Sequence, residues 1–296
     1  MELKRKYYPE PVMKENRYQE IEYLTFELLE KTQVVTHMIS TRVGGVSQGI
    51  FSSMNYSYNR GDDRNLVDEN YRRTAAIFGK SAADFVCSDQ THTVHVRKVT
   101  GKDRGKGVLY PKDYTDTDGL ITDEEGIILS TFYADCVPLL FVDPVRRAIG
   151  CSHSGWRGTA QEMGRITVER MQEEYGCRPE NIYAAIGPSI CQDCYEVSQD
   201  VAEVFEELFA QSRFKDIVGN EKQISGAEIC YQKENGKYQL NLWKSNEAIL
   251  LGAGILPEHL AVTDVCTCCN PQVLFSHRAS CGKRGNIGAF LMLREI

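Results

Sequence analysis

Three apolar segments follow one another between residues 126 and 153 without a helical segment between them. Short apolar runs bounded by turn signals are typical of buried strands, and a turn at Asp143-Pro144 joins the last two runs. The runs are GIILSTF (126–132), VPLLFVD (137–143) and RAIGCSH (147–153). A doubly wound fold alternates its strands with helices. These consecutive strands therefore argue against a pure doubly wound architecture.

The remaining segments alternate between strand-like and helix-like patterns. Strands are expected at 32–40, 94–100, 181–187, 260–265 and 286–293, and helices at 65–79, 159–176, 198–212 and 241–255. Thr159 and Ser198 stand where a side chain can cap the first turn of a helix. No internal repeat or Pro/Ser-rich linker divides the chain. We therefore expect an α+β (mixed α/β) fold, built as a single domain over 1–296 with mixed β-sheets flanked by helices.

Composition argues against several classes of protein. A chain of 296 residues can bury about 75% of its unfolded surface, so it needs neither disulfide nor metal to fold. The net charge of −7 argues against a nucleic-acid partner, and no apolar run is long enough for a membrane span. The N-terminus lacks the apolar stretch of a secretory signal. With 11 cysteines and no export signal, we expect mostly free thiols and a cytoplasmic protein.

Two histidines and a cysteine stand at the ends of expected strands. His92 and Cys136 each lie just before a strand, and His153 ends another. Because the ends of neighbouring strands gather at one edge of a sheet, these three side chains can converge. Two imidazoles and a thiolate are a good donor set for Zn²⁺, and three protein ligands leave a fourth position open for catalysis. The same set also suits copper.

Other interpretations of these residues stay open at this point. Cys136 and His153 can form the nucleophile and the base of a cysteine hydrolase, with Asp135 orienting the imidazole. Cys136 can equally be a small buried residue beside an apolar strand. Ligation by metal and nucleophilic attack exclude each other, because one thiolate is not expected to serve both tasks.

A second group of cysteines lies near the C-terminus. Cys266, Cys268 and Cys269 are close in sequence. Neighbouring residues such as 268 and 269 point to opposite faces of a strand. We therefore expect a structural or incidental role for this group rather than a second metal site.

Glycine-rich loops that carry arginine accompany the candidate metal ligands. Arg42 lies in TRVGGVSQG and Arg157 in GWRG, just before an expected helix. Arg278 lies in FSHRASCGKRG, which also contains Lys283 and Arg284. A guanidinium binds phosphate or carboxylate through two parallel hydrogen bonds, and a helix N-terminus favours an anion. These loops therefore suit an anionic cosubstrate.

Eight sequence motifs follow one another along the chain. They are STRVGGVSQGIFSSMN, DQTH, TDGLIT, ADCVPLLFVDP, HSGWRG, AAIGPSICQDCYEV, CTCCNPQVLFSHR and GKRG. Together they resemble the YfiH-like family, long called polyphenol oxidases or laccase-domain proteins and now regarded as zinc-dependent purine nucleoside phosphorylases. The resemblance runs from about residue 35 to the C-terminus. It implies a YfiH/CNF-like fold.

The resemblance also implies an activity. Members of this family are transferases that cleave adenosine, inosine, guanosine or methylthioadenosine with phosphate to free base and a sugar 1-phosphate. Adenosine deaminase activity, a hydrolase reaction, accompanies it. The implied partners are purine nucleosides and phosphate, with no nucleic acid and no membrane, and the expected state is a monomer or a homodimer.

The family's metal set falls on His92, Cys136 and His153. This implies that the three residues bind zinc, with copper as the alternative, and it disfavours the cysteine nucleophile. Asp135, next to Cys136, is then the implied proton carrier. The implied catalytic residues are Asp135, Arg42 and Cys136, and the implied substrate-binding residues are Arg42, Asn55, Arg157 and Arg278.

This chain departs from the family pattern in two places. Relatives often end near TGRMA, whereas this chain has KRGNIGAFLML, which leaves the register of Arg284 open. Relatives commonly have Gly after the histidine of DQTH, whereas this chain continues with TVHV. His95 is therefore a near neighbour of His92, although we do not expect it to bind the metal.

Two further classes remain as alternatives. A copper-dependent polyphenol oxidase matches the older name of the family, but laccases hold several copper centres, and the six histidines of this chain are few for such a set. A non-catalytic, metal-stabilised module is the other alternative. It predicts that removal of the metal unfolds the protein.

Overall fold

Two six-stranded mixed sheets form the centre of the protein in the computed structural model, which describes residues 1–7, 10–219 and 223–296. The first sheet has the order β1 (Met13–Tyr18), β2 (Ile21–Phe26), β3 (Val35–Ser40), β15 (Ile287–Leu293), β7 (Ile128–Tyr133) and β4 (Phe85–Cys87). The second has the order β14 (Leu260–Val262), β10 (Tyr183–Ile186), β8 (Val137–Asp143), β9 (Ala148–Ser154), β6 (Gly119–Thr122) and β5 (Val96–Lys98). A small third sheet has the order β11 (Glu196–Val197), β13 (Tyr238–Leu240) and β12 (Cys230–Gln232).

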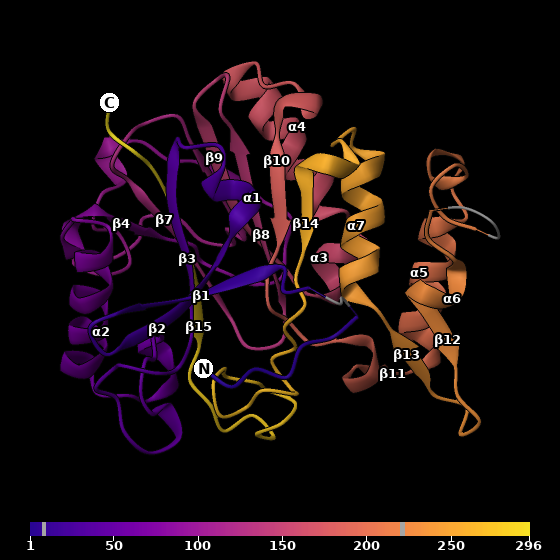
Figure 1. The fold of residues 1–296 in the computed structure, drawn as a ribbon, viewed down its shortest axis with the longest axis horizontal. Coiled ribbons are helices and arrows are strands. Elements are labelled where there is room, and N and C mark those ends of the chain that lie inside the picture. The colour runs from indigo at the N-terminus through magenta and orange to yellow at the C-terminus, as the bar shows by residue number, and fades with distance from the viewer. Residues whose placement is uncertain (8–9, 220–222) are drawn as a thin grey trace.

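Helices cover the outer faces of the two large sheets (Figure 1). The helices are α1 (Glu27–Glu30), α2 (Arg64–Ile77), α3 (Trp156–Ala160), α4 (Met163–Tyr175), α5 (Gln199–Phe209), α6 (Gly226–Ile229) and α7 (Leu242–Gly252). Helix α2 packs on the first sheet, and α4 and α7 pack on the second. Helices α5 and α6 project with the small sheet at one end of the molecule (Figure 1). The expected mixed α/β class, with mixed sheets flanked by helices, is therefore confirmed.

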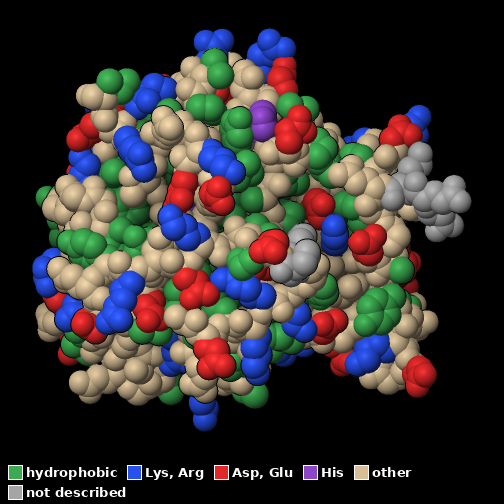
Figure 2. Space-filling model, in the orientation of Figure 1, with side chains coloured by type: hydrophobic (Ala, Val, Ile, Leu, Met, Phe, Trp, Pro, Cys, Tyr) green, Lys and Arg blue, Asp and Glu red, His purple; other side chains and the backbone are tan. Residues whose placement is uncertain are grey.

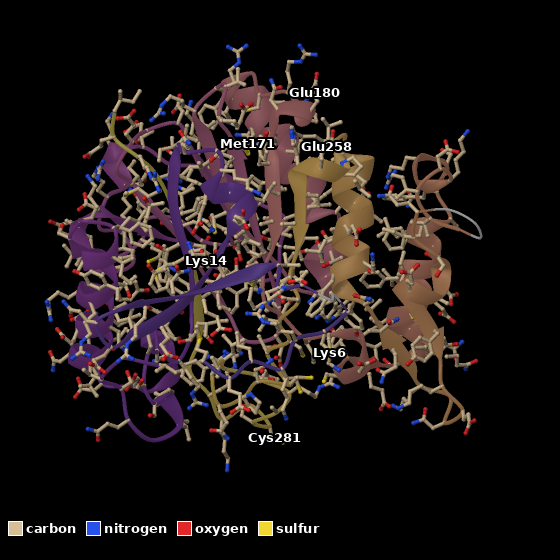
Figure 3. The ribbon with its side chains drawn as sticks, viewed as in Figure 1. Lys6, Lys14, Met171, Glu180, Glu258 and Cys281 are labelled. Carbon is tan, nitrogen blue, oxygen red and sulfur yellow. The ribbon has the colours of Figure 1, made fainter. Side chains whose placement is uncertain are left out.

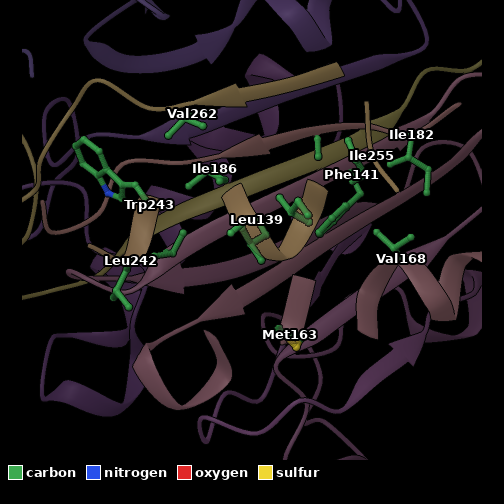
Figure 4. Close-up of a cluster of buried hydrophobic side chains, with 14 of the residues drawn as sticks. Leu139, Phe141, Met163, Val168, Ile182, Ile186, Leu242, Trp243, Ile255 and Val262 are labelled. Carbon is green, nitrogen blue, oxygen red and sulfur yellow. The ribbon is translucent and has the colours of Figure 1, made fainter. Parts of the chain in front are cut away.

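Three large apolar cores hold these layers together, and a small fourth cluster consists of Leu208, Phe214 and Ile249. One lies between the two large sheets and includes Leu129, Leu140 and Leu291. Another joins the second sheet to its helices, where Leu139, Met163 and other side chains interdigitate (Figure 4). The third packs α2 against the first sheet. Since β8 is buried on both faces, its residues form a continuous apolar run instead of an alternating one.

The three consecutive strands predicted from 126 to 153 are all present, but they belong to different sheets. β7 lies in the first sheet, whereas β8 and β9 form an antiparallel hairpin in the second. The chain crosses between the sheets at residues 134–136. Asp135 has a φ of 88° there, which is uncommon for a residue with a Cβ and is found where the surrounding structure imposes it. The crossing places Cys136 at the start of β8.

Two details of the prediction are wrong at the helix expected over 159–176. Thr159 is not its N-cap, because it lies inside α3 and its buried hydroxyl bonds with Ser154. The backbone breaks at Glu162, whose φ is 60°, and α4 begins at Met163. Gly176, with a φ of 64°, ends α4. Sequence reasoning did not predict the strands β1, β2, β4 and β6 or the small third sheet.

Charged side chains of both signs are interspersed over the face shown in Figure 2. No helix in the described part of the chain has the length and apolarity needed to cross a bilayer.

Candidate metal centre and adjoining cavity

The side chains of His92, Cys136 and His153 come together in the structure. Their potential ligand atoms all lie within 4.8 Å of one another. The Cys136 Sγ is 4.0 Å from His92 Nε2, and the two imidazole rings are 5.0 Å apart at 79°. Zinc–ligand bonds of about 2.0–2.3 Å in a tetrahedron place neighbouring ligand atoms roughly 3.5 Å apart. The donor set and its spacing therefore fit a zinc ion after small side-chain movements.

Strand register brings two of these residues together, and a loop supplies the third. Pro138 pairs with His153 in the β8–β9 hairpin, so Cys136 stands beside the end of β9. His92 lies in the loop before β5 with a φ of 68°. His95, in the same loop, is exposed and is not part of the group.

Asp118 orders both histidines, and sequence reasoning missed it. Its carboxylate Oδ1 accepts a hydrogen bond from the backbone N–H of His92 at 3.1 Å and lies 2.8 Å from His153 Nδ1. Its Oδ2 accepts from the backbone N–H groups of Thr91 and Thr93, both at 3.0 Å. A carboxylate behind a histidine fixes the ring and leaves its other nitrogen free for a metal. The signal was the aspartate of the TDGLIT block, just before β6.

Charge in the group favours a thiolate. Burial alone would raise the pKa of Cys136, but His153 and then His92 stabilise the thiolate and lower it to about 6. Burial would likewise lower the pKa of His153, yet Cys136 and Asp118 raise it to about 9. In the absence of metal the two residues therefore form a thiolate–imidazolium pair. A metal cation would replace that proton, since it binds thiolate and neutral imidazole.

Gly155 lets the backbone approach this group closely. A Cβ at Gly155 would lie 3.0 Å from His92 Cδ2 and 3.1 Å from Cys136 Sγ. Any side chain there would press on both residues. The glycine that opens GWRG is therefore needed for space beside the candidate ligands, and Arg157 of the same motif is exposed, with its guanidinium 4.3 Å from the Trp156 ring.

A cavity of about 500 Å³ opens beside the group, and His92, Cys136 and His153 form part of its wall. This volume is in the range of small-molecule sites. Tyr58 and Phe132 supply aromatic wall, and the further polar lining includes Ser88, Asp89 and Lys112. Such a mixture can hold a flat aromatic ligand and orient it through a few polar groups.

Arg284, whose register was left open, lines this cavity together with Arg60. Its Nη1 donates to Asn286 Oδ1 and to the Gly285 carbonyl, whereas its buried Nε has no hydrogen-bond partner among the described residues. Burial, and then repulsion from Arg60, lowers the pKa of Arg284 to about 10. A half-buried, partly unpaired guanidinium beside a second cation is a favourable place for an anion.

Two residues predicted to bind substrate, Arg42 and Asn55, make hydrogen bonds within the protein. Arg42 donates to the carbonyls of Ser52 (2.7 Å) and Pro271 (2.9 Å), and it is not part of the cavity lining. Asn55 is fully buried, and its Oδ1 accepts from the backbone N–H of Asn286 at 2.9 Å. The structure therefore does not bring Arg42 or Asn55 to this cavity, although Asn55 supports the segment that carries Arg284.

Asp135 and Arg278 lie on a different border of the centre. Both oxygens of the buried Asp135 carboxylate accept hydrogen bonds, Oδ1 from the Thr267 hydroxyl (2.6 Å) and Oδ2 from the Arg278 backbone N–H (2.7 Å). The Arg278 guanidinium donates to the carbonyls of Cys194 and Glu196, both at 3.1 Å. Neither residue lines the cavity. This arrangement anchors the loop after β14 to the crossing at Cys136.

A second group of potential ligands consists of Cys191, Cys194, Cys266 and Cys269. Residues 267–269 form a turn and not a strand, and Cys268 is outside this group. The structural or incidental role expected for the C-terminal cysteines stays a prediction. The available signal was a pair of C-x-x-C spacings, CQDC and CTCC.

The fold and the His-Cys-His group together define a two-sheet α/β protein with a candidate metal centre at the crossing between the sheets. The family model for "Multi-copper polyphenol oxidoreductase laccase" matches residues 36–294. The chain belongs to this family, the YfiH-like proteins expected from its sequence blocks.

Relatives and a solved structure support this membership. The chain is 37% identical over 257 residues to "Purine nucleoside phosphorylase YlmD" of Bacillus subtilis, covering 86% of this chain and 87% of that protein. It is 30% identical over 259 residues to "Adenosine deaminase RL5" of an unknown prokaryotic organism, covering 87% and 94%. The crystal structure of YlmD from Geobacillus stearothermophilus superposes with a TM-score of 0.84 at 32% identity, covering 97% of this chain and all of that one.

Proposed function

We propose that this chain is a metal-dependent purine nucleoside phosphorylase that uses zinc held by His92, Cys136 and His153. The observation that carries the proposal is a single cavity with a set of potential metal ligands in one wall and the half-buried, partly unpaired Arg284 in another. The names of relatives at 30% identity and above point to the same chemistry.

The reaction joins phosphate to the sugar and releases the base. A phosphate oxygen forms a bond to the anomeric carbon, the glycosidic C–N bond breaks, and its electron pair leaves with the purine, which takes up a proton. The sugar becomes cation-like in the transition state. The enzyme must therefore bind a dianion close to the sugar and hold the base in a fixed orientation, which lowers the barrier through positioning.

The residues of the chain divide these tasks. Arg284 and Arg60 bind the phosphate, since a guanidinium pairs with two phosphate oxygens at once. The aromatic wall, with Tyr58 and Phe132, contacts the flat base. Asp118 holds His153 and the His92 loop in place. A zinc ion held by the three ligands would supply a Lewis acid with one open position.

We propose that Asp135 is a positioning residue and not the proton carrier. Its two oxygens already accept hydrogen bonds from Thr267 and Arg278. Arg157 and Arg278 lie around Tyr195, as do Cys136 and Asp135. Burial raises the pKa of Tyr195, and the charge of Cys136 raises it further. These two arginines are proposed to border the substrate from that side.

Adenosine deamination is the second candidate activity, favoured by the name of the relative RL5. With water in place of phosphate, attack on the purine ring would release ammonia and leave the glycosidic bond intact. The products distinguish the two reactions. Copper-dependent phenol oxidation finds less support, because the described histidines do not gather into several centres: His37 is buried in a hydrogen bond with Phe26, and His259 stacks on Tyr183.

One experiment tests the proposal. The zinc-loaded protein is incubated with adenosine, inosine, guanosine or methylthioadenosine, with and without phosphate, and the products are separated by chromatography. Free base and a sugar 1-phosphate should form only with phosphate. The absence of phosphate-dependent base release at full zinc occupancy would overturn the proposal, and inosine formed from adenosine without phosphate would establish the deaminase. Copper content with dioxygen uptake would establish the oxidase.

A further inference from the structure

Four cysteines from two distant segments meet behind the candidate active site. Cys191 precedes the 3-10 turn that follows β10 and Cys194 ends it, and Cys266 precedes the turn at 267–269 and Cys269 ends it. All four sulfur atoms lie within 4.8 Å of one another. Each pair has the C-x-x-C spacing, and 71 residues separate the two pairs. Two C-x-x-C pairs that converge form a common framework for a four-thiolate metal site.

The distances fit a tetrahedron of thiolates around one ion. Zinc–sulfur bonds of about 2.3 Å place the sulfur atoms roughly 3.8 Å apart in a tetrahedral site. The Sγ of Cys269 lies 3.5 Å from that of Cys194 and 4.0 Å from that of Cys191. These values bracket the expected spacing. They are far beyond the S–S bond of about 2.05 Å in a disulfide, so the group is not a pair of disulfides.

The surroundings of the group supply what bound thiolates need. Two backbone N–H groups, of Cys191 and Cys269, donate to the Sγ of Cys266 at 3.2 and 3.4 Å. Within the second C-x-x-C pair, the backbone N–H of the last cysteine, Cys269, donates to the sulfur of the first, Cys266. Hydrogen bonds to the charged form favour a thiolate over a thiol. These two donors would stabilise the charge on the Cys266 sulfur once it is bound to a cation.

A lysine brings positive charge to the outer side of the group. The pKa of Lys6 is raised mainly by its hydrogen bond with Asp193 at 3.0 Å. The nearby Cys191 and Cys269 raise it further. Figure 3 labels Lys6 on the N-terminal segment. That segment is tied to the same turn, because the Lys4 N–H donates to Asn270 Oδ1 at 2.7 Å. The cation offsets part of the negative charge that four thiolates and one divalent ion carry together.

We propose that Cys191, Cys194, Cys266 and Cys269 bind a second, structural zinc ion. Four protein ligands close the coordination sphere, so this site takes no substrate. Binding forms four zinc–sulfur bonds, and the thiol protons are released to solvent; no oxidant takes part and zinc stays divalent. The proposal is independent of the proposed function, because it uses none of the residues His92, Cys136 or His153.

The second zinc ties together the loops that border the first centre. The segment between β10 and β11 joins the segment after β14 through Cys191 and Cys266, and the Thr267 N–H donates to the Ser189 carbonyl at 3.1 Å. Thr267 holds Asp135, the neighbour of Cys136. The carbonyl of Cys194 accepts from Arg278. We therefore expect the four-cysteine site to position Arg278 and the crossing at Asp135.

The test begins with the native chain. Protein purified without added metal is analysed for metal content, and zinc X-ray absorption is recorded on the wild type and on Cys136→Ala. The wild type should hold two zinc ions per chain. Cys136→Ala should keep one, with four sulfur ligands at about 2.3 Å. A single zinc in the wild type surrounded by nitrogen and one sulfur would overturn the proposal, as would iron in the four-sulfur site.

A matched pair of variants then separates ligation from packing. Cys194→Ser should lose one zinc, whereas Cys268→Ser, adjacent to Cys269 but outside the group, should keep both. If Cys194→Ser does not fold, the wild-type protein is treated stepwise with a chelator and then alkylated. The zinc that leaves last should protect the four cysteines from alkylation. Mass spectrometry of the peptides measures this protection. Full alkylation of these cysteines with zinc still bound would overturn the proposal.

Discussion

Asp118 and His153 are joined by a buried contact of 2.8 Å between the carboxylate Oδ1 and the imidazole Nδ1. The contact directs the other ring nitrogen of His153 toward the candidate metal centre. Because the same carboxylate also accepts from the backbone N–H of His92, one residue sets the position of two of the three candidate ligands. The candidate metal centre therefore depends on a side chain outside the group of potential ligands.

Replacement of Asp118 should weaken the metal centre. Asp118→Asn removes the charge that supports His153, and loss of such a partner lowers metal affinity by about 10- to 100-fold. Competition with a zinc chelator measures the change. Asp116→Asn is the control, since Asp116 accepts from the Thr91 hydroxyl on the same loop without contacting either imidazole. Equal zinc affinity in the two variants would contradict the role given to Asp118.

Gly155 offers a steric test of the same centre. A methyl group in Gly155→Ala would meet His92 and Cys136 at about 3 Å, so the variant should bind zinc more weakly while its melting temperature changes little. Gly158→Ala is the control, because a Cβ there meets nothing closer than 3.5 Å. Unchanged zinc affinity in Gly155→Ala would show that the three ligands do not meet where the structure places them.

Arg284 should determine how tightly phosphate binds. Arg284→Gln removes a charge-assisted hydrogen bond, so the KM for phosphate should rise roughly 10- to 100-fold with a smaller effect on the KM for nucleoside. Steady-state kinetics with each substrate varied in turn measures both constants. Lys283→Gln, the exposed neighbouring cation, should behave like the wild type. A rise in the nucleoside KM alone would place the anion site elsewhere.

His37 should make the protein sensitive to acid. Burial lowers its pKa from 6.5 to about 4, and its Nε2 accepts the Phe26 N–H at 2.8 Å. Between these pH values the unfolded chain binds a proton that the folded chain excludes, so stability rises with pH. The contribution is complete above pH 6.5, and about 3 kcal/mol is lost as pH falls toward 4. Urea unfolding across this range should show a shallower pH dependence for His37→Gln.

Cys136 should react as a thiolate once the metal is removed. Burial opposes ionisation, but His153 lowers its pKa to about 6. Alkylation of Cys136 by iodoacetamide in chelator-treated protein, followed on its own peptide, should increase through pH 6 and then level off. His153→Asn should move that midpoint to higher pH. A midpoint near the ordinary value of about 8.5 in the wild type would contradict the thiolate–imidazolium pair.

The sequence alone indicated the class of fold and the three candidate ligands of the first centre. Apolar runs such as 137–143 indicate buried strands, because a strand that is buried on both faces needs apolar side chains on both. The turn of the hairpin sets how Cys136 and His153 face each other. The ordered blocks identified the family. These features are local, so short-range pattern and order suffice to find them.

Only the tertiary structure decided which distant groups meet. It placed β7 and β8 in different sheets, brought Arg284 to the cavity, left Arg42 and Asn55 outside its lining, and assembled Cys191 and Cys194 with Cys266 and Cys269. Asp118 acts across 35 residues of sequence on His153. Periodicity reports which face of an element is buried, whereas the partner on the other side depends on how sheets and loops pack against one another, and that packing is set by the whole chain.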